Sequence, residues 1–158
     1  EKAIELNPDD ADAYYNIGNV YYKQGNYTKA IESYERAIEL NPDNASAYNN
    51  MGVAYGKQGD YTKAISLFMK AIDLKPDYEK AYYSTGLAYQ NLGNHTKAIS
   101  LYKKAIDLKP DYAEAYNNMG LAYGFQGNHT KAINLFTKAA RLGLPEAQNI
   151  LKQIGHDW

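Results

Sequence analysis

The sequence contains no cysteine, and its charges nearly cancel. Without cysteine the chain forms no disulfides and offers no thiolate as a nucleophile or metal ligand. Lysine and arginine (17) balance aspartate and glutamate (18), so the formal net charge of -1 lacks the basic excess of a nucleic-acid-binding protein. No apolar run approaches the roughly 20 residues that a membrane-spanning helix needs. We therefore expect no nucleic-acid partner and no membrane insertion.

The sequence favours a cytoplasmic chain, and its first residues resemble the end of a structural unit. The lack of cysteine and of a visible signal peptide favours a reducing compartment. Residues 1–10 (EKAIELNPDD) match residues 35–44 (ERAIELNPDN), but no helix precedes them in the sequence. Ala3, Ile4 and Leu6 would then lack their apolar cover. We expect residues 1–7 to form an edge that self-associates.

One pattern recurs four times, always at an interval of 34 residues. Each copy begins Tyr-x-x-x-Gly-x-x-Tyr, and the first tyrosines are Tyr14, Tyr48, Tyr82 and Tyr116. Each copy then continues with a second glycine, an alanine, an aromatic residue and another alanine, which in the second copy are Gly59, Ala64, Phe68 and Ala71. A fixed period of this length predicts an array of similar units that pack only on their neighbours.

Each unit reads as two antiparallel helices, A and B. Apolar residues fall at helical spacing before the second glycine, as in Ala47, Met51 and Ala54, and again after it. Aspartates after the prolines are placed to cap helix A, the second glycines to end it in a left-handed conformation, and the next residues to cap helix B. These are, in turn, Asp43, Asp77 and Asp111; Gly25, Gly59, Gly93 and Gly127; and Asn26, Asp60, Asn94 and Asn128.

A glycine in the middle of each A helix predicts a close contact. Glycine there costs about 1 kcal/mol of helix propensity relative to alanine, so its retention indicates that a side chain would not fit. We expect the neighbouring helix to approach closely at Gly18, Gly52, Gly86 and Gly120.

The repeat resembles the tetratricopeptide repeat family, whose aromatic, Gly, Tyr, Ala, aromatic and Pro positions fall at these offsets, with Tyr here in place of the opening Trp. The resemblance implies an all-α, right-handed superhelical solenoid of antiparallel helix pairs, with the A helices lining a concave groove. The expected divisions are a partial repeat at 1–10, repeats at 11–44, 45–78, 79–112 and 113–144, and a carboxyl-terminal capping helix and tail at 145–158.

No constellation of polar residues predicts catalysis. His95 and His129 occupy the first turn of helix B where other copies carry Tyr27 and Tyr61, so we expect them to be aromatics packed at the turn. Residues one repeat apart lie roughly 10 Å from each other, far beyond the reach of a shared metal ion. We therefore expect no catalytic residue, no metal site, no cofactor and no enzymatic activity.

The resemblance assigns binding to the inward positions of the A helices, which vary while the scaffold does not. We call the predicted binding residues the A-helix face. They are Tyr15, Asn16, Asn19, Tyr22, Lys23, Asn49, Asn50, Val53, Gly56, Lys57, Lys80, Tyr83, Ser84, Leu87, Asn117, Asn118, Leu121, Gly124 and Phe125.

Two patterns on this face are similar to known recognition devices. The row Asn16, Asn50, Ser84 and Asn118 is similar to the asparagine ladder of the O-linked N-acetylglucosamine transferases, which implies amides that hydrogen-bond a peptide backbone; consensus filling is the alternative. Asn19, Asn50 and Lys80 match the clamp that grips the terminal carboxylate of chaperone tails. Tyr15 and Ser84 replace two of that clamp's three cations, which argues against a carboxylate clamp.

The units also alternate along the chain. The first and third carry Tyr15 and Tyr83, whereas the second and fourth carry Gly56 and Gly124 at solvent-facing helical positions. Such glycines either leave pockets or record the duplication of a two-repeat block.

The favoured function is a scaffold that binds an extended, weakly charged segment of a partner protein. The alternatives are a self-assembly element and the non-catalytic arm of a larger enzyme.

Overall fold

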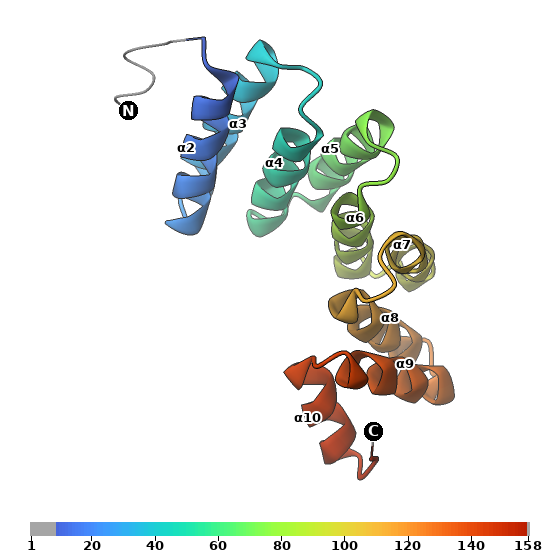
Figure 1. The fold of residues 1–158 in the computed structure, drawn as a ribbon. Helices are drawn as coiled ribbons and strands as arrows, with labels where there is room; N and C mark the ends of the chain where they lie inside the picture. Colours follow the sequence, from blue (N-terminus) through green and yellow to red (C-terminus); the bar gives the residue numbers. More distant parts are fainter. Residues whose placement is uncertain (1–8, 158) are drawn as a thin grey trace. The chain divides into compact units, whose positions relative to one another are not determined.

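The computed structural model describes residues 9–157, which form helices and no strand (Figure 1). The expectation for residues 1–7 lies outside this range. The helices are α2 (Ala11–Lys23), α3 (Tyr27–Leu40), α4 (Ala45–Lys57), α5 (Tyr61–Leu74), α6 (Glu79–Asn91), α7 (His95–Leu108), α8 (Ala113–Phe125), α9 (His129–Arg141) and α10 (Pro145–Gln153).

The chain divides into two compact units, Glu1–Asp77 and Tyr78–Trp158. Within the first, α2 pairs with α3 and α4 with α5, and α3 packs on α4. Within the second, α6 pairs with α7 and α8 with α9, while α7 packs on α8 and α9 on α10. The all-α arrangement of consecutive antiparallel helix pairs is confirmed.

Aromatic rings of the B helices fill the space beside the central glycines of the A helices. A Cβ built on Gly86 would lie 2.6 Å from a ring carbon of Tyr102, which is itself fully buried. The corresponding distances at Gly18, Gly52 and Gly120, to Tyr34, Phe68 and Phe136, are 2.5, 2.6 and 2.7 Å. The predicted close approach is confirmed, and an aromatic ring of the paired helix makes it.

The predicted turn between helices A and B is also confirmed. Gly59, for example, has φ +86°, and the Asp60 carboxylate accepts a hydrogen bond of 2.9 Å from the backbone N–H of Lys63. Asn26, Asn94 and Asn128 accept the equivalent bonds from Lys29, Lys97 and Lys131. Each second glycine thus ends one helix, and the residue after it caps the next.

The predicted caps of the A helices are wrong by one residue. Asn44, not Asp43, caps α4, and its side-chain oxygen accepts a 3.0 Å bond from the Ala47 N–H. In the turn before α4, the Asn41 side-chain oxygen also accepts a bond of 3.3 Å from the Asp43 N–H. Asp77 and Asp111 were expected to cap α6 and α8. The caps are instead Tyr78 and Tyr112, which make no side-chain cap bond.

A lysine-aromatic contact ties the two helices together in every repeat. The Lys97 ammonium lies 4.9 Å from the centre of the Tyr89 ring, which stands near the end of α6. The same contact joins Lys29 to Tyr21, Lys63 to Tyr55 and Lys131 to Tyr123. The lysine that donates to the helix-B cap therefore also holds the preceding helix.

We expect Lys97→Met to lower the free energy of unfolding by roughly 0.5 kcal/mol, because it removes the cation over the half-buried Tyr89 ring but keeps the apolar stem. Chemical denaturation measures the loss. Lys104→Met, at an exposed position on the same helix, is the matched control. Equal losses in the two variants would contradict a role for the ring contact.

Candidate functional site

In the first unit, the A-helix face carries a hydrogen-bond network between α2, α3 and α4. The Asn50 amide donates to the Asn19 side-chain oxygen at 3.0 Å and to the Tyr15 hydroxyl at 3.1 Å. The Tyr34 hydroxyl donates to the same Asn19 oxygen at 2.8 Å, and the Asn49 amide donates to the Asn50 oxygen at 3.2 Å. Both N–H groups of Asn50 are therefore already used within the chain.

The second unit repeats half of this arrangement. The Asn118 amide donates to the Tyr83 hydroxyl at 2.8 Å and to the Glu114 backbone oxygen at 3.0 Å. Leu87 occupies the position equivalent to Asn19, so the Tyr102 hydroxyl has no amide there. It donates instead to the Gln90 side chain at 2.9 Å. Both N–H groups of Asn118 are again used within the chain.

These bonds give Tyr15 and Tyr83 each a partner in the next repeat. Tyr15 accepts from Asn50, and Tyr83 accepts from Asn118, so a tyrosine of one repeat pairs with an asparagine of the next. Burial, followed by the nearby Glu114 carboxylate, raises the pKa of Tyr83 to about 12. The asparagines thus join neighbouring A helices, and their N–H groups are not free for a peptide backbone. The likeness to the asparagine ladder of the transferases is not confirmed.

A small cleft lies beside the network in the first unit. It has a volume of about 90 Å³ and is lined by Asn19, Tyr22, Tyr34, Asn50 and Val53. Four of these residues belong to the A-helix face predicted from the sequence. Its volume is about that of three water molecules in the liquid, so it suits a small polar or apolar group.

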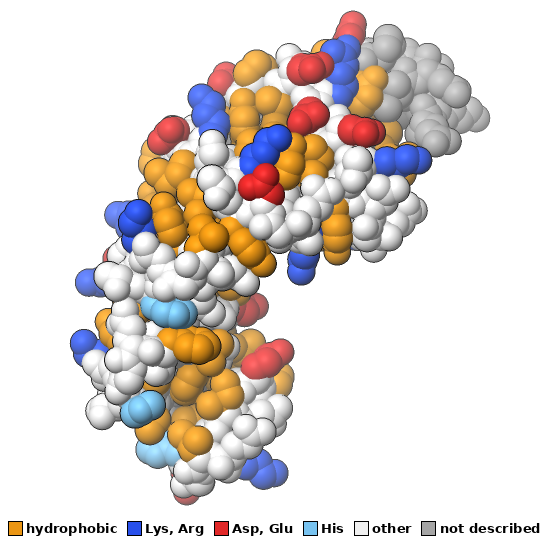
Figure 2. All heavy atoms as spheres, turned by 180° about the vertical axis from the view of Figure 1, so that it is seen from behind, with side chains coloured by type: hydrophobic (Ala, Val, Ile, Leu, Met, Phe, Trp, Pro, Cys, Tyr) orange, Lys and Arg blue, Asp and Glu red, His pale blue; other side chains and the backbone are white. Residues whose placement is uncertain are grey.

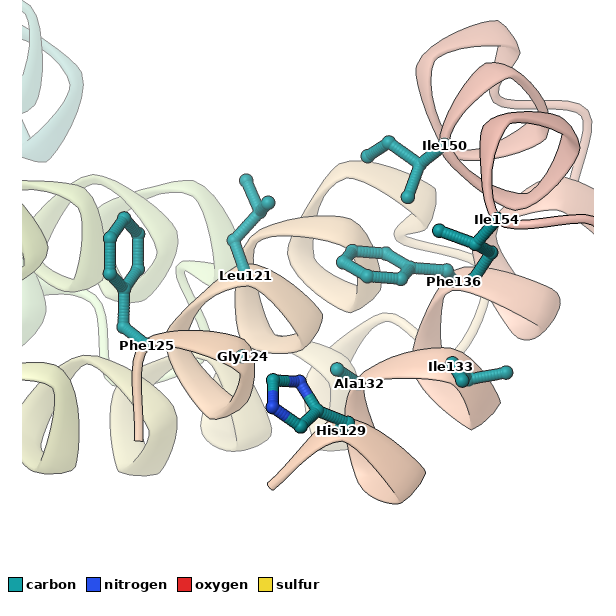
Figure 3. A pocket seen from close by; sticks show the side chains of 9 residues that line it. All are labelled: Leu121, Gly124, Phe125, His129, Ala132, Ile133, Phe136, Ile150 and Ile154. Atoms are coloured by element: carbon teal, nitrogen blue, oxygen red, sulfur yellow. The ribbon is translucent and has the colours of Figure 1, made fainter. Parts of the chain in front are cut away.

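A larger and more apolar pocket lies in the second unit between α8, α9 and α10 (Figure 3). Its volume is about 620 Å³, and His129 is its only polar lining side chain. In Figure 3, Leu121 of α8 and Ile154, the C-cap of α10, lie on either side of the Phe136 ring. The full lining is Leu121, Gly124, Phe125, His129, Ala132, Ile133, Phe136, Ile150 and Ile154.

Sequence reasoning found only part of this pocket. Leu121, Gly124 and Phe125 belong to the A-helix face, whereas Ile133 and Phe136 follow the helical period that ordinarily marks a core. Ile150 and Ile154 lie on the apolar side of the capping helix. Their spacing of four residues, which places both on one side of α10, was the available signal.

Gly56 and Gly124 differ from the central glycines of the A helices because no neighbouring atom lies close to them. A Cβ built on Gly124 meets no atom within 4 Å, and one built on Gly56 meets only the Ala64 Cβ at 4.0 Å. Gly124 lines the apolar pocket. The absence of a side chain at Gly124 therefore enlarges a hollow, as the pocket alternative requires.

The other residues of the A-helix face differ in exposure. Asn49 and Asn117 are buried, at 5% and 9% exposure, so they offer a ligand little surface. The Phe125 side chain is 72% exposed. Asn16, Lys23, Lys57 and Lys80 are exposed, whereas Tyr15, Asn19, Tyr22, Asn50, Val53, Gly56, Tyr83, Ser84, Leu87, Asn118, Leu121 and Gly124 are half-buried.

The two histidines have different surroundings. His95 stacks on Phe125 with ring centres 4.8 Å apart and planes inclined by 9°, which confirms the predicted aromatic packing. His129 is exposed at the pocket, so the same prediction is wrong there. Across residues 9–157, no group of three or more His, Asp or Glu side chains is placed to hold a metal ion. In the same range, no helix is both long enough and apolar enough to span a bilayer.

Solved structures similar to this chain include MamA proteins and a TPR domain. A crystal structure of MamA has a TM-score of 0.82 and 33% identity, covering 93% of this chain and 86% of that one. MamA from Desulfovibrio magneticus RS-1 has a TM-score of 0.80 and 25% identity, covering 88% and 78%. The first TPR of Spaghetti (RPAP3), bound to the HSP90 peptide SRMEEVD, has a TM-score of 0.72 and 29% identity, covering 74% and 93%.

Two family models match the repeats directly. The model described as TPR repeat matches residues 1–25 and 18–59, and the model described as Tetratricopeptide repeat matches residues 43–111 and 77–143. No curated protein matches the chain. The second model alone spans well over half of the sequence, and its repeats coincide with the helix pairs. The chain therefore belongs to the tetratricopeptide repeat family.

Proposed function

We propose that the chain is a non-catalytic scaffold that holds a segment of a partner protein against its A-helix face. The observation that carries the proposal is that both hollows described above open beside residues of this face. Asn19, Tyr22 and Val53 line the small cleft, and Leu121, Gly124 and Phe125 line the apolar pocket. The similar RPAP3 domain, solved with a bound peptide, supports a peptide segment as the ligand.

The charges near the face favour a weakly charged partner. Lys23, Lys57 and Lys80 are cationic, and Asp12 and Glu114 are anionic, so they nearly cancel. In the first unit the Tyr15 hydroxyl, rather than an ammonium group, approaches Asn50. A partner held by apolar side chains and a few polar groups fits this surface better than an acidic tail does.

We expect the acidic peptide SRMEEVD not to bind this chain at concentrations up to about 1 mM, because charge-assisted bonds to its carboxylates need cations that Tyr15 and Ser84 do not supply. Fluorescence anisotropy with the labelled peptide measures binding, and the RPAP3 domain solved with this peptide serves as the positive control. Micromolar binding to this chain would show that a carboxylate clamp is present after all.

Charged substitutions on the A-helix face test the proposal. A partner is first isolated with the whole protein, and its bound segment is identified by peptide mapping. We expect Val53→Arg or Leu87→Arg to weaken that segment at least about tenfold, because each places a charge in the contact. Both residues are half-buried and lie outside the apolar pocket. Isothermal titration measures the affinity, and thermal melting checks that the variants fold.

Exposed lysines on the B helices provide the matched controls. Lys70→Ala on α5 and Lys104→Ala on α7 should leave the affinity unchanged. If the control variants lose as much affinity as the face variants, or if the face variants lose none, the partner binds elsewhere and the proposal is wrong.

A further inference from the structure

The hydrogen bonds on the A-helix face limit the kind of segment that binds there. An extended peptide brings backbone N–H and C=O groups that need partners once water is displaced. Two of the three asparagines in the predicted ladder are already used: Asn50 donates to Tyr15 and Asn19, and Asn118 donates to Tyr83 and Glu114. A helix satisfies its own backbone and needs only side-chain contacts.

The apolar pocket presents side chains at the spacing of a helix-binding groove. Leu121 and Phe125 are four residues apart on α8, and Ile150 of α10 is four residues before Ile154, the C-cap of that helix. The Phe136 ring lies between them in Figure 3. A volume of about 620 Å³ is large enough for several apolar side chains.

Large apolar side chains at this pocket are unusually exposed. Phe125 is 72% exposed and Ile154 is 53% exposed. Figure 2 shows hydrophobic side chains gathered beside histidines in the second unit, with few charged groups among them. Apolar surface of this kind typically marks an interaction site.

Acidic side chains stand in the first turns of two of the helices that line the pocket. Glu114 stands in the first turn of α8 and Glu146 in the first turn of α10, and both are exposed. Helical periodicity places Glu114 in line with Leu121, and Glu146 in line with Ile150. Lys138 and Arg141, in the last turn of α9, point away from the pocket-lining side of that helix by the same periodicity.

We propose that this pocket receives one face of an amphipathic helix of the partner protein. The helix carries uncharged apolar residues at positions i, i+4 and i+7, and a lysine or arginine at the end that meets Glu114 and Glu146. This inference rests on the proposed function, because Leu121, Gly124 and Phe125 of the A-helix face line the pocket. It replaces the extended segment predicted from the sequence with a helical one in the second unit.

Synthetic helices test the inference on the whole chain. The probes are a panel of hydrocarbon-stapled peptides of about 15 residues, with Leu, Ile or Phe at i, i+4 and i+7 and two lysines at one end. Unstapled peptides of the same composition, with a central proline that prevents a helix, are the matched probes. Fluorescence anisotropy is expected to show stapled members binding at least about tenfold more tightly than their proline counterparts.

Paired variants locate the bound helix. Gly124→Tyr fills the pocket without displacing any atom near its Cβ, so it should weaken the stapled probes at least about tenfold. Lys104→Tyr, which adds the same ring at an exposed position of α7 outside the pocket, should leave their affinity unchanged. Glu146→Gln should weaken them about threefold and reduce the dependence of affinity on salt.

Several results would overturn the inference. The first is that no stapled peptide binds below about 100 µM, and the second is that the proline peptides bind equally well. Loss of a natural partner in Val53→Arg but not in Gly124→Tyr would leave the proposed function standing and reject the pocket. A tryptophan emission that shifts to the red in unliganded Gly124→Tyr would place Trp158, the only tryptophan, in the pocket instead.

Discussion

Replacing Gly86 with leucine is expected to lower the free energy of unfolding of the second unit by about 3 kcal/mol. Even the first added carbon would lie 2.6 Å from the Tyr102 ring. That ring cannot move aside easily, because it is fully buried and its hydroxyl donates to Gln90. Urea denaturation followed by circular dichroism measures the loss, and an early transition separate from the rest of the chain is expected because repeat arrays lose stability locally.

A second glycine of the same unit provides the control. Gly124→Ala adds a carbon where no atom lies within 4 Å, so it should raise the free energy of unfolding by about 0.5 to 1 kcal/mol through helix propensity alone. If Gly86→Leu and Gly124→Ala shift the free energy of unfolding in the same direction, the close contact between Gly86 and the Tyr102 ring is contradicted.

Alkaline conditions are expected to unfold the chain between about pH 10 and pH 12. Burial, followed by the Glu114 carboxylate, raises the pKa of Tyr83 to about 12, and burial also raises the pKa of Tyr34 and Tyr102. The folded state therefore favours the neutral phenols. Their contribution to stability is fully present below the unfolded tyrosine pKa of about 10 and is lost as pH rises through the folded values.

Thermal melting at a series of pH values from 8 to 12 measures this loss, with ultraviolet absorbance reporting phenolate formation. Tyr102→Phe is the informative variant. The Tyr102 side chain is fully buried, and phenylalanine in its place has no hydroxyl to ionise. Its melting temperature should fall less steeply above about pH 10 than that of the unchanged chain. Identical slopes would mean that the buried Tyr102 hydroxyl does not govern alkaline unfolding.

The features predicted correctly from the sequence depend on local backbone chemistry or on a period. Gly59 and Asp60 define a turn within a few residues, and the central Gly86 predicts a close contact whatever the neighbour is. The cap at Asp43 was predicted wrongly because a turn that is one residue longer moves the cap to Asn44. Predictions from local patterns do not depend on distant packing. They fail, however, when a loop is one residue longer than expected.

The binding face was harder to predict because its side chains also interact with one another. Asn50 reads as a free amide in the sequence, yet its orientation is set by Asn19 and Tyr15 on the neighbouring helix. That contact depends on side-chain rotamers across a helix interface, and no sequence period encodes them. Gly124 was informative because a glycine expected to face solvent inside a helix has no packing contact that would explain it.

Position-specific photo-crosslinking tests the central claim, that the A-helix face holds the partner, most directly. A benzophenone amino acid is placed at Tyr22 or Phe125 on this face, or at Lys70 or Lys104 on the B helices, in the whole protein. Cross-linked partner peptides are then quantified by mass spectrometry. The account predicts strong cross-links to one partner segment from Tyr22, Phe125 or both, and little from the lysine positions. Cross-links concentrated at Lys70 or Lys104 would contradict it.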